Sequence, residues 1–308
     1  MDFPEPRTMP STLAPLFDAL VVQQDDPDFE GTRPTGLAGV RVFRCARPLP
    51  RQPLVYEPGL VIVGQGRKLG HLKGRQFVYD ASSYLILTVP LPFECETFAS
   101  PEAPLMGLFI DIDAQRIRSL LDEVDKTTIP SVKRDDMPRG VEPARLDDEM
   151  VDAVSRLLRC LCYSDDRRVL GAGLVNEVVY RALRGPHGAA LVSLAEQQSA
   201  FARVAQALAF VHENYHQSIA VEELARISAM SMSTFFRAFK EVAGDTPLGY
   251  IKKIRLDRAR ALLLQGPLAV SDVAYEVGYE SPAQFSREFK RHFSTTPSAL
   301  RKLELSAR

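Results

Sequence analysis

The chain contains 308 residues, of which 45% are hydrophobic and 25% charged, so it can hold two domains and a sizeable core. Its longest apolar runs are far shorter than the roughly 20 residues that cross a bilayer, and its first residues are acidic and proline-rich, so we expect a cytoplasmic protein with no membrane partner. The net charge of -1 is uneven, because residues 199–308 carry 15 Lys and Arg against 11 Asp and Glu, which suggests a polyanion-binding module in the C-terminal third.

Short β-type runs broken by Gly and Pro fill residues 37–113. Examples are GVRVFRC, LVYEPGLVIVGQG and SSYLILTVPLPFECETF. Closely spaced short strands are typical of a small barrel or sandwich. We therefore predict a β-rich N-terminal domain.

From residue 114 the apolar residues recur at three- and four-residue spacing, which predicts helices. The apolar stripe of one helix, at Val151, Val154, Leu157, Leu158 and Leu161, is more often core than interface. A helical hairpin that leaves a compact β-domain is nevertheless a natural dimerisation element, so a homodimer is our hypothesis. The stretch RGPHGAALVSLAEQQS that follows is typical of a linker.

The remaining residues are helical and contain an internal repeat. VEELARISAMSMSTFFRAFKEVAGDTP, residues 221–247, is echoed by VSDVAYEVGYESPAQFSREFKRHFSTTP, residues 270–297. Each copy has a short helix with an inward Ala, a tight turn, and a second helix opened by Ser231 or by Ser281-Pro282. The offset is 49 residues before the turn and 50 after it, so the second turn is one residue longer. This pattern predicts two helix-turn-helix units.

At about 100° per residue, the second helix of each copy has one packing face and one free face. In the first copy Phe235, Ala238, Phe239 and Val242 cluster on the packing side. The free faces carry Ser233, Thr234, Arg237 and Lys240 in the first copy, and Ala283, Gln284, Arg287 and Lys290 in the second. A mid-helix arginine beside small or amide side chains suits guanine readout in the major groove, and lysines one turn on suit phosphates. Either helix alone would more often be a solvated surface; the repeat makes DNA readout the stronger interpretation.

A predicted helix of about 18 residues, roughly 27 Å long, lies between the two copies. It could hold two recognition helices about one DNA turn apart, near 34 Å, on one face of a duplex.

At these residues the C-terminal hundred positions resemble the DNA-binding domain of the AraC/XylS family of bacterial transcription regulators. The stretch GQGRKLGHLKGRQFVYDASSYLILTVPLPFE also resembles the cupin-like effector domain of one branch of that family. The second copy departs from the family at Ser294, where Gly usually follows the Phe, so the end of that helix is an open question.

The resemblance implies an α+β chain with a cupin-like β-barrel and helical hairpin over residues 1–184, a linker over 185–200, and a DNA-binding domain of two helix-turn-helix units over 201–308. It also implies a non-enzymatic transcription regulator, which we expect to be an activator, without a cofactor or metal. Its partners would be promoter DNA, an unknown small-molecule effector, a second copy of the chain and RNA polymerase. The DNA-contacting positions would be Ser231, Ser233, Thr234, Phe236, Arg237, Lys240, Ala283, Gln284, Arg287 and Lys290.

His212-Glu213-Asn214-Tyr215-His216 is a literal H-E-x-x-H, in which two imidazoles one helical turn apart can hold zinc. The motif lies on the helix that enters the DNA-binding domain, and the acidic residues that follow belong to the repeat. A catalytic zinc needs three protein ligands and an open position. We therefore expect the two histidines to lie on a solvated helix flank.

Other motifs of enzymes are weak. GQGRKLG, residues 64–70, is one residue too long for G-x-G-x-x-G and lies between β-type runs, so a β-turn is the better interpretation. His71 is the only histidine before His187, which argues against a metal-dependent cupin enzyme, our alternative from another class of protein.

The four cysteines form no CxxC pair, so we expect reduced thiols, mostly buried. Cys95 lies between Glu94 and Glu96, whose charge should raise its thiol pKa and disfavour a reactive thiolate. A redox- or electrophile-responsive regulator that acts through Cys95 is accordingly a secondary alternative.

Overall fold

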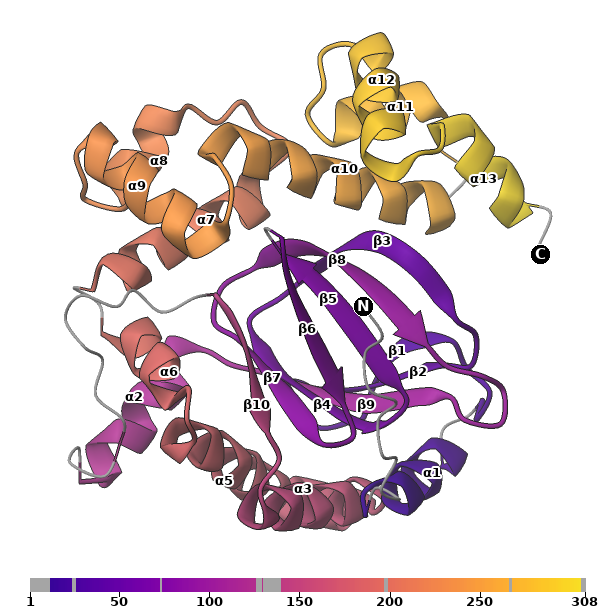
Figure 1. Cartoon of the computed structure of the whole chain (residues 1–308), viewed down its shortest axis with the longest axis vertical. Helices are drawn as coiled ribbons and strands as arrows, with labels where there is room; N and C mark the ends of the chain where they lie inside the picture. The colour runs from indigo at the N-terminus through magenta and orange to yellow at the C-terminus, as the bar shows by residue number, and fades with distance from the viewer. Residues whose placement is uncertain are drawn as a thin grey trace.

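In the computed structural model, the described residues are 12–23, 26–72, 74–125, 129, 140–196, 199–265 and 268–305. A β-rich domain comes first and a helical domain follows it (Figure 1). This arrangement agrees with the predicted α+β fold.

The β-rich domain contains two antiparallel sheets, one of six strands in the order β1-β2-β9-β4-β7-β10 and one of four in the order β3-β8-β5-β6. The strands are β1 (Gly31–Pro34), β2 (Val40–Cys45), β3 (Leu49–Tyr56), β4 (Gly59–Gln65), β5 (Arg67–Leu72), β6 (Arg75–Asp80), β7 (Ser83–Leu87), β8 (Leu91–Phe98), β9 (Leu105–Asp111) and β10 (Val141–Arg145).

The predicted closed barrel is corrected to two sheets packed face to face. Among the described strands, the two sheets are separate hydrogen-bonded ladders, so β3 and β6 form edges of the small sheet. Aromatic side chains of the small sheet, such as Tyr79 and Phe93, pack against Val61 and Phe109 of the large sheet. This apolar layer joins the sheets as in a sandwich.

Helices cover the other face of the large sheet. Helices α1 (Ala14–Val22), α3 (Asp148–Leu161) and α5 (Gly171–Arg184) pack there, and α4 (Ser164–Val169) connects the last two. Of the predicted stripe, Val154, Leu157, Leu158 and Leu161 are buried in this core and Val151 is partly buried, so the preference for core over interface is confirmed.

Two further helices lie between the domains. Helix α2 (Ala114–Glu123) contacts α6 (Gly188–Ala195), which falls inside the stretch predicted as a linker. Leu191 of α6 is fully buried in the core beneath the large sheet. Part of that stretch is therefore ordered helix packed on the β-rich domain.

The helical domain contains the predicted repeat. It consists of α7 (Ala200–Asn214), α8 (Val221–Ile227), α9 (Met232–Ala243), α10 (Pro247–Gln265), α11 (Val270–Glu276), α12 (Pro282–Phe293) and α13 (Pro297–Leu305). Helices α8 and α11 correspond at an offset of 49 residues, and α9 and α12 at an offset of 50. The inward Ala225 and Ala274 are buried, as expected.

The turn of each unit contains one residue with a left-handed backbone conformation. Ala229 has φ 48° and Gly278, its counterpart, has φ 85°. After the recognition helices, Gly244 has φ 84° and Ser294 has φ 57°. Serine therefore adopts the conformation usually given to glycine, and α12 ends at the position that corresponds to the end of α9.

Candidate DNA interface and effector pocket

The free face of α9 is built as predicted. Ser231 caps the helix by accepting a hydrogen bond from the backbone N–H of Thr234 at 3.4 Å. Phe235 and Phe239 are fully buried beneath the helix. The predicted contact residues of this unit, Ser231, Ser233, Thr234, Phe236, Arg237 and Lys240, are all exposed.

The free face of α12 follows the same geometry. Ser281 caps it by accepting from the backbone N–H of Gln284 at 3.3 Å, and Phe285 and Phe289 are fully buried. The predicted contact residues Ala283, Gln284, Arg287 and Lys290 are exposed. The burial pattern thus confirms which face of each helix is free, while contact with bases stays a prediction.

Glu288 positions α12 against the helix that joins the two units. It accepts from Lys252 of α10 at 3.0 Å, from Tyr279 at 2.9 Å and from Gln284 at 3.3 Å. Burial alone would raise the pKa of Glu288, but these hydrogen bonds outweigh it, so the pKa is lowered and the carboxylate stays charged. The amide of Gln284 is consequently oriented before any ligand arrives.

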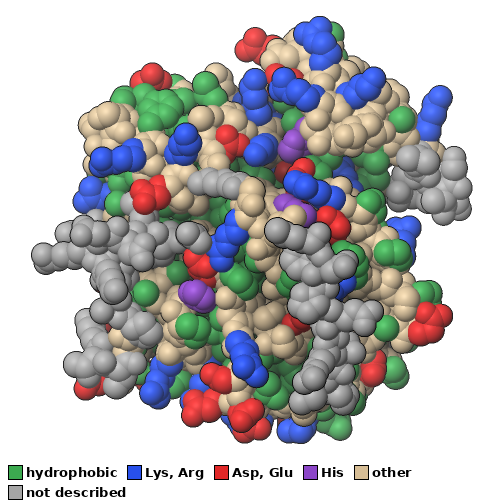
Figure 2. All heavy atoms as spheres, in the orientation of Figure 1, with side chains coloured by type: hydrophobic (Ala, Val, Ile, Leu, Met, Phe, Trp, Pro, Cys, Tyr) green, Lys and Arg blue, Asp and Glu red, His purple; other side chains and the backbone are tan. Residues whose placement is uncertain are grey.

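Helix α10 has 19 residues, close to the length predicted for the spacer. It runs between the α8–α9 unit and the α11–α12 unit (Figure 1). Several Lys and Arg side chains gather over these helices in Figure 2, and acidic side chains lie among basic ones at the opposite end of the molecule. The basic side chains over these helices agree with the excess of Lys and Arg in residues 199–308.

The H-E-x-x-H motif does not lie on one helix, because α7 ends at Asn214 and His216 comes after it. His216 is exposed, as expected for a solvated flank, but the expectation was wrong for His212. The His212 side chain is only 8% exposed, and its Nε2 lies 2.9 Å from the Tyr250 hydroxyl. Burial, with a smaller effect of Arg258, lowers the pKa of His212 to about 4. The two imidazoles therefore have different environments and do not form a metal-binding pair.

Tyr250 also binds the β-rich domain. Its hydroxyl donates to the carbonyl oxygen of Pro90 at 2.7 Å. A hydroxyl has one hydrogen, so His212 must donate its Nε2 hydrogen to the Tyr250 oxygen. The imidazole therefore carries its hydrogen on Nε2 and has a bare Nδ1.

Side chains of helix α10 bind to strand β3 and to Glu57, the residue that follows it. Arg260 donates to the carbonyl oxygen of Pro53 at 3.3 Å and to the side chain of Gln52. Arg258 forms an ion pair with Glu57 at 3.3 Å. Because β3 is an edge strand, its outward backbone groups are open to such side chains.

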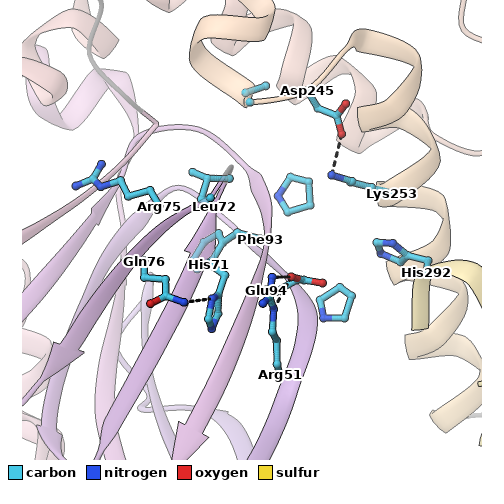
Figure 3. Close-up of a pocket in the computed structure, with 15 residues that line it drawn as sticks. Arg51, His71, Leu72, Arg75, Gln76, Phe93, Glu94, Asp245, Lys253 and His292 are labelled. Carbon is cyan, nitrogen blue, oxygen red and sulfur yellow. Dashed lines mark hydrogen bonds and ion pairs between the residues drawn. The ribbon is translucent and has the colours of Figure 1, made fainter. Parts of the chain in front are cut away.

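A cavity of about 460 Å³ lies beside this contact, between the small sheet and the helical domain (Figure 3). Arg51 pairs with Glu94 on the sheet side, and Lys253 pairs with Asp245 on the helix side at 2.8 Å. These ion pairs neutralise much of the charge in the lining, so the cavity is a poor candidate for a charged ligand.

A different cavity, of about 490 Å³, opens between the two sheets. We call it the intersheet pocket. Its lining combines apolar side chains, among them Phe43, Val61, Leu105 and Phe109, with the charged side chains of Glu30, Arg41, Arg44, Arg47 and Glu57. Lys68 of β5 also lines it, with its ammonium 2.7 Å from the Tyr56 hydroxyl oxygen.

The charge of Lys68 is stabilised inside this pocket. Burial would lower the pKa of Lys68, but the facing Tyr56 and Cys95 groups more than offset it, and the pKa is raised. An ammonium has three N–H donors, and Tyr56 occupies one of them. Sequence reasoning missed Lys68 and Tyr56; the only signal was one lysine at an inward position of an alternating strand.

Cys95 lies at the end of a polar chain that starts at Lys68. The Tyr56 and Tyr79 hydroxyls are 2.7 Å apart, and the Tyr79 hydroxyl lies 3.4 Å from the Cys95 sulfur. Cys95 is 3% exposed, and its thiol pKa is raised, as expected. The largest cause is burial, opposed by Lys68, and the charge of Glu94 is a minor contribution.

Within the described residues, no group of three or more His, Cys, Asp and Glu side chains is placed to hold a metal ion. The helices of that same part of the chain are all too short or too polar to span a bilayer.

The paired helix-turn-helix units with exposed recognition faces define a DNA-binding transcription regulator. Residues 36–190 match the model of the AraC-type transcriptional regulator N-terminus, and residues 224–303 match a helix-turn-helix domain. The first match covers half of the chain, so the protein belongs to the AraC/XylS family.

Similar proteins agree with this assignment. The thermoregulatory protein LcrF of Yersinia pestis is 26% identical over 250 residues, which cover 80% of this chain and 89% of LcrF. The transcriptional regulator GlxA of Rhizobium meliloti is 44% identical over 79 residues, which cover 26% of this chain but only 24% of GlxA. The fold is similar to that of an apo point variant of ToxT from Vibrio cholerae, with a TM-score of 0.58 at 12% identity over 89% of this chain and 98% of that one.

Proposed function

We propose that this regulator binds a small-molecule effector in the intersheet pocket and transmits its presence to the DNA-binding units. One observation carries the proposal: a charged Lys68, whose only hydrogen-bond partner among the described residues is Tyr56, faces a cavity with apolar walls and more basic than acidic side chains. Effector binding shifts DNA affinity only if the affinity for the effector differs between two arrangements of the DNA-binding units.

The pocket chemistry favours an effector with one acidic group and an apolar body. A carboxylate would accept hydrogen bonds from Lys68, and charge-assisted bonds of this kind are about twice as strong as neutral ones. In support, one ToxT structure of similar fold, with a TM-score of 0.56, is bound to an unsaturated fatty acid.

Calorimetric titration of the full chain with oleate and with oleyl alcohol tests this effector class. We expect oleate to bind at least about tenfold more tightly, because the alcohol lacks the charge that Lys68 recognises. Lys68→Met should remove the difference, whereas Arg184→Met, on the exposed surface of α5, should preserve it. Equal binding of the two probes to the wild type would refute an acidic effector.

We further propose that α9 and α12 read successive major grooves through the ten predicted contact residues. Selection of duplexes from a random pool by the full-length protein at two salt concentrations tests this. Recovery of two G-containing boxes one helical turn apart supports the proposal. A pool without enrichment, in the presence and absence of oleate, would count against it.

We also propose a homodimer that forms through the hairpin of the β-rich domain. At the connection between α3 and α5, Tyr163 is 63% exposed, Val169 79% and Leu170 52%. Exposed apolar groups of this size favour association. Sedimentation of Val169→Glu/Leu170→Glu should report monomers if this surface pairs two chains, and a dimer as in the wild type would overturn the assignment.

Activation of transcription through RNA polymerase in the cytoplasm is proposed from relatives such as the virulence regulon transcriptional activator VirF of Yersinia enterocolitica, 28% identical over 200 residues. We assign residues 1–184 to effector binding and dimerisation, 185–200 to the connection, and 201–308 to DNA binding.

We propose no catalytic activity, because the buried His212 and exposed His216 do not share a site. Stoichiometric zinc or iron in purified protein would favour the enzyme alternative instead.

A further inference from the structure

A third cavity, of about 600 Å³, lies where α7 meets the β-rich domain. We call it the α7 cavity. Of the lining residues of the intersheet pocket, it shares only Glu57 among the described residues. Its walls are largely apolar and come from both domains, with Pro58, Pro90 and Ile112 on one side and the small residues Ala202, Ala205 and Ala209 of α7 on the other.

Two buried polar side chains line this cavity with unused hydrogen-bonding atoms. Thr88 is 1% exposed, and its Oγ1 has no hydrogen-bond partner among the described residues. Nδ1 of His212 is likewise buried and unpartnered within the described chain. Leaving such an atom unsatisfied costs about 1–3 kcal/mol, so each needs a reason.

The hydrogen-bond chain described above fixes what these atoms can accept. Because the Nε2 hydrogen of His212 goes to Tyr250, Nδ1 is an acceptor that requires a donor. Glu57 Oε1 lies 3.9 Å from Nδ1 and is itself an acceptor, and the nearby Arg258 is paired with Glu57. No donor among the described residues is hydrogen-bonded to Nδ1, and the Thr88 hydroxyl, which can both donate and accept, is likewise unpartnered there.

The charges around the cavity balance. Arg118 and Arg258 line it together with Glu57 and Glu213. Arg258 is already paired with Glu57 at 3.3 Å. A ligand with a net charge of either sign would meet a group of the same sign, so the lining favours a neutral one.

We propose that the α7 cavity is a second small-molecule site, which takes an uncharged amphipathic molecule with a hydroxyl group, such as a phenol or an alcohol. The hydroxyl donates to Nδ1 of His212 and contacts Thr88, and the apolar body lies against the alanines of α7. Such a ligand touches both domains at once. Its binding free energy is therefore linked to their relative placement, independently of the intersheet pocket.

Two probes with nearly the same body test the requirement for a donor: 2-naphthol, and 2-methoxynaphthalene, in which the hydroxyl hydrogen is replaced by a methyl group. Fluorescence titration of the full chain should give at least about tenfold tighter binding of 2-naphthol, because a site built around an unpaired acceptor rejects the analogue that lacks the donor. Histidine-labelled protein provides a second measurement, since the nitrogen resonance of Nδ1 in His212 should shift on addition of 2-naphthol.

Three variants locate the binding. Ala205→Leu narrows the α7 cavity and should weaken 2-naphthol binding by at least about tenfold. Thr88→Val keeps the side-chain shape and should weaken it by about three- to tenfold. Lys68→Ala alters the intersheet pocket and should leave it unchanged.

Equal affinity for the two probes would overturn the proposal, because the unpaired atoms would then be satisfied by water alone. Loss of 2-naphthol binding in Lys68→Ala, with full binding in Ala205→Leu, would also overturn it by placing the molecule between the sheets. Thermal unfolding of each variant, followed by circular dichroism, checks that the variant is folded under the conditions of the titration.

Discussion

Tyr250 donates its phenolic hydrogen to the carbonyl oxygen of Pro90 at 2.7 Å and so joins the helix between the two helix-turn-helix units to the β-rich domain. Tyr250→Phe leaves this carbonyl and the His212 Nε2 hydrogen without a partner. We expect the free energy of unfolding in urea to fall by about 1–3 kcal/mol. Tyr275→Phe, at a position that is 58% exposed, is the matched control and should behave as the wild type.

Stability should also fall in acid because of His212. Burial, and secondarily Arg258, lower its pKa from 6.5 to about 4, so the unfolded chain binds a proton before the folded chain does. The free energy of unfolding therefore decreases as pH falls from about 6.5 to about 4, by up to about 3 kcal/mol from this group. Urea unfolding of His212→Gln at pH 7, 5.5 and 4 should show a flatter profile. The exposed His216→Gln is the control, and superimposable profiles for His212→Gln and the wild type would contradict the prediction.

Asp257 of α10 should have the opposite effect on the pH dependence of stability. Burial raises its pKa to about 7 against the opposing effects of Arg260, Lys253 and Arg258. The folded chain keeps this proton between about pH 4 and 7 while the unfolded chain loses it, so stability falls as pH rises through that window. Asp257→Asn should be more stable than the wild type by about 2 kcal/mol at pH 8 and equal to it below pH 4. Exposed Asp272→Asn should change neither value.

The left-handed Ser294 predicts a stabilising substitution. Its φ of 57° strains a residue with a Cβ, so Ser294→Gly should raise the free energy of unfolding by about 0.5–1 kcal/mol. The corresponding Gly244→Ala should lower it, since Gly244 has φ 84°. Denaturant midpoints of the two variants check the signs, and a destabilised Ser294→Gly would show that the serine hydroxyl has a role of its own.

The recognition helices predict two kinds of DNA-binding defect. Arg237→Ala and Arg287→Ala should each lose about 1–3 kcal/mol on the selected site and relax the preference at one base pair. Lys290→Ala should weaken specific and random duplexes alike, because phosphates carry no base identity. Titration of both duplex types measures this, and equal losses on both for the arginine variants would argue against base readout.

The repeat could be predicted because its information is local. Buried Phe235 and Phe285 recur at an offset of 50 residues, and helical spacing then assigns four exposed positions in each of α9 and α12, whereas the exposed Phe236 is named only from the family resemblance. The capping serines follow from the same local pattern.

The environments of single polar residues could not be predicted in this way. His212 is buried because of Tyr250, which is 38 residues away, and Tyr250 is held by Pro90, 160 residues away. Lys68 points between the sheets because of the register of β5 with β6 and β8. Whether the sheets close into a barrel depends on the pairing of their edges, which alternation along one strand does not reveal.

The extra residue of the second turn, Glu280, separates otherwise equivalent units. The units also differ in what they present, because the exposed Phe236 of α9 corresponds to Ser286 of α12. A chain that reads DNA through both helices therefore meets two boxes that are not interchangeable. Its complex with a duplex is therefore asymmetric, and a single bound copy has a defined orientation relative to the direction of transcription.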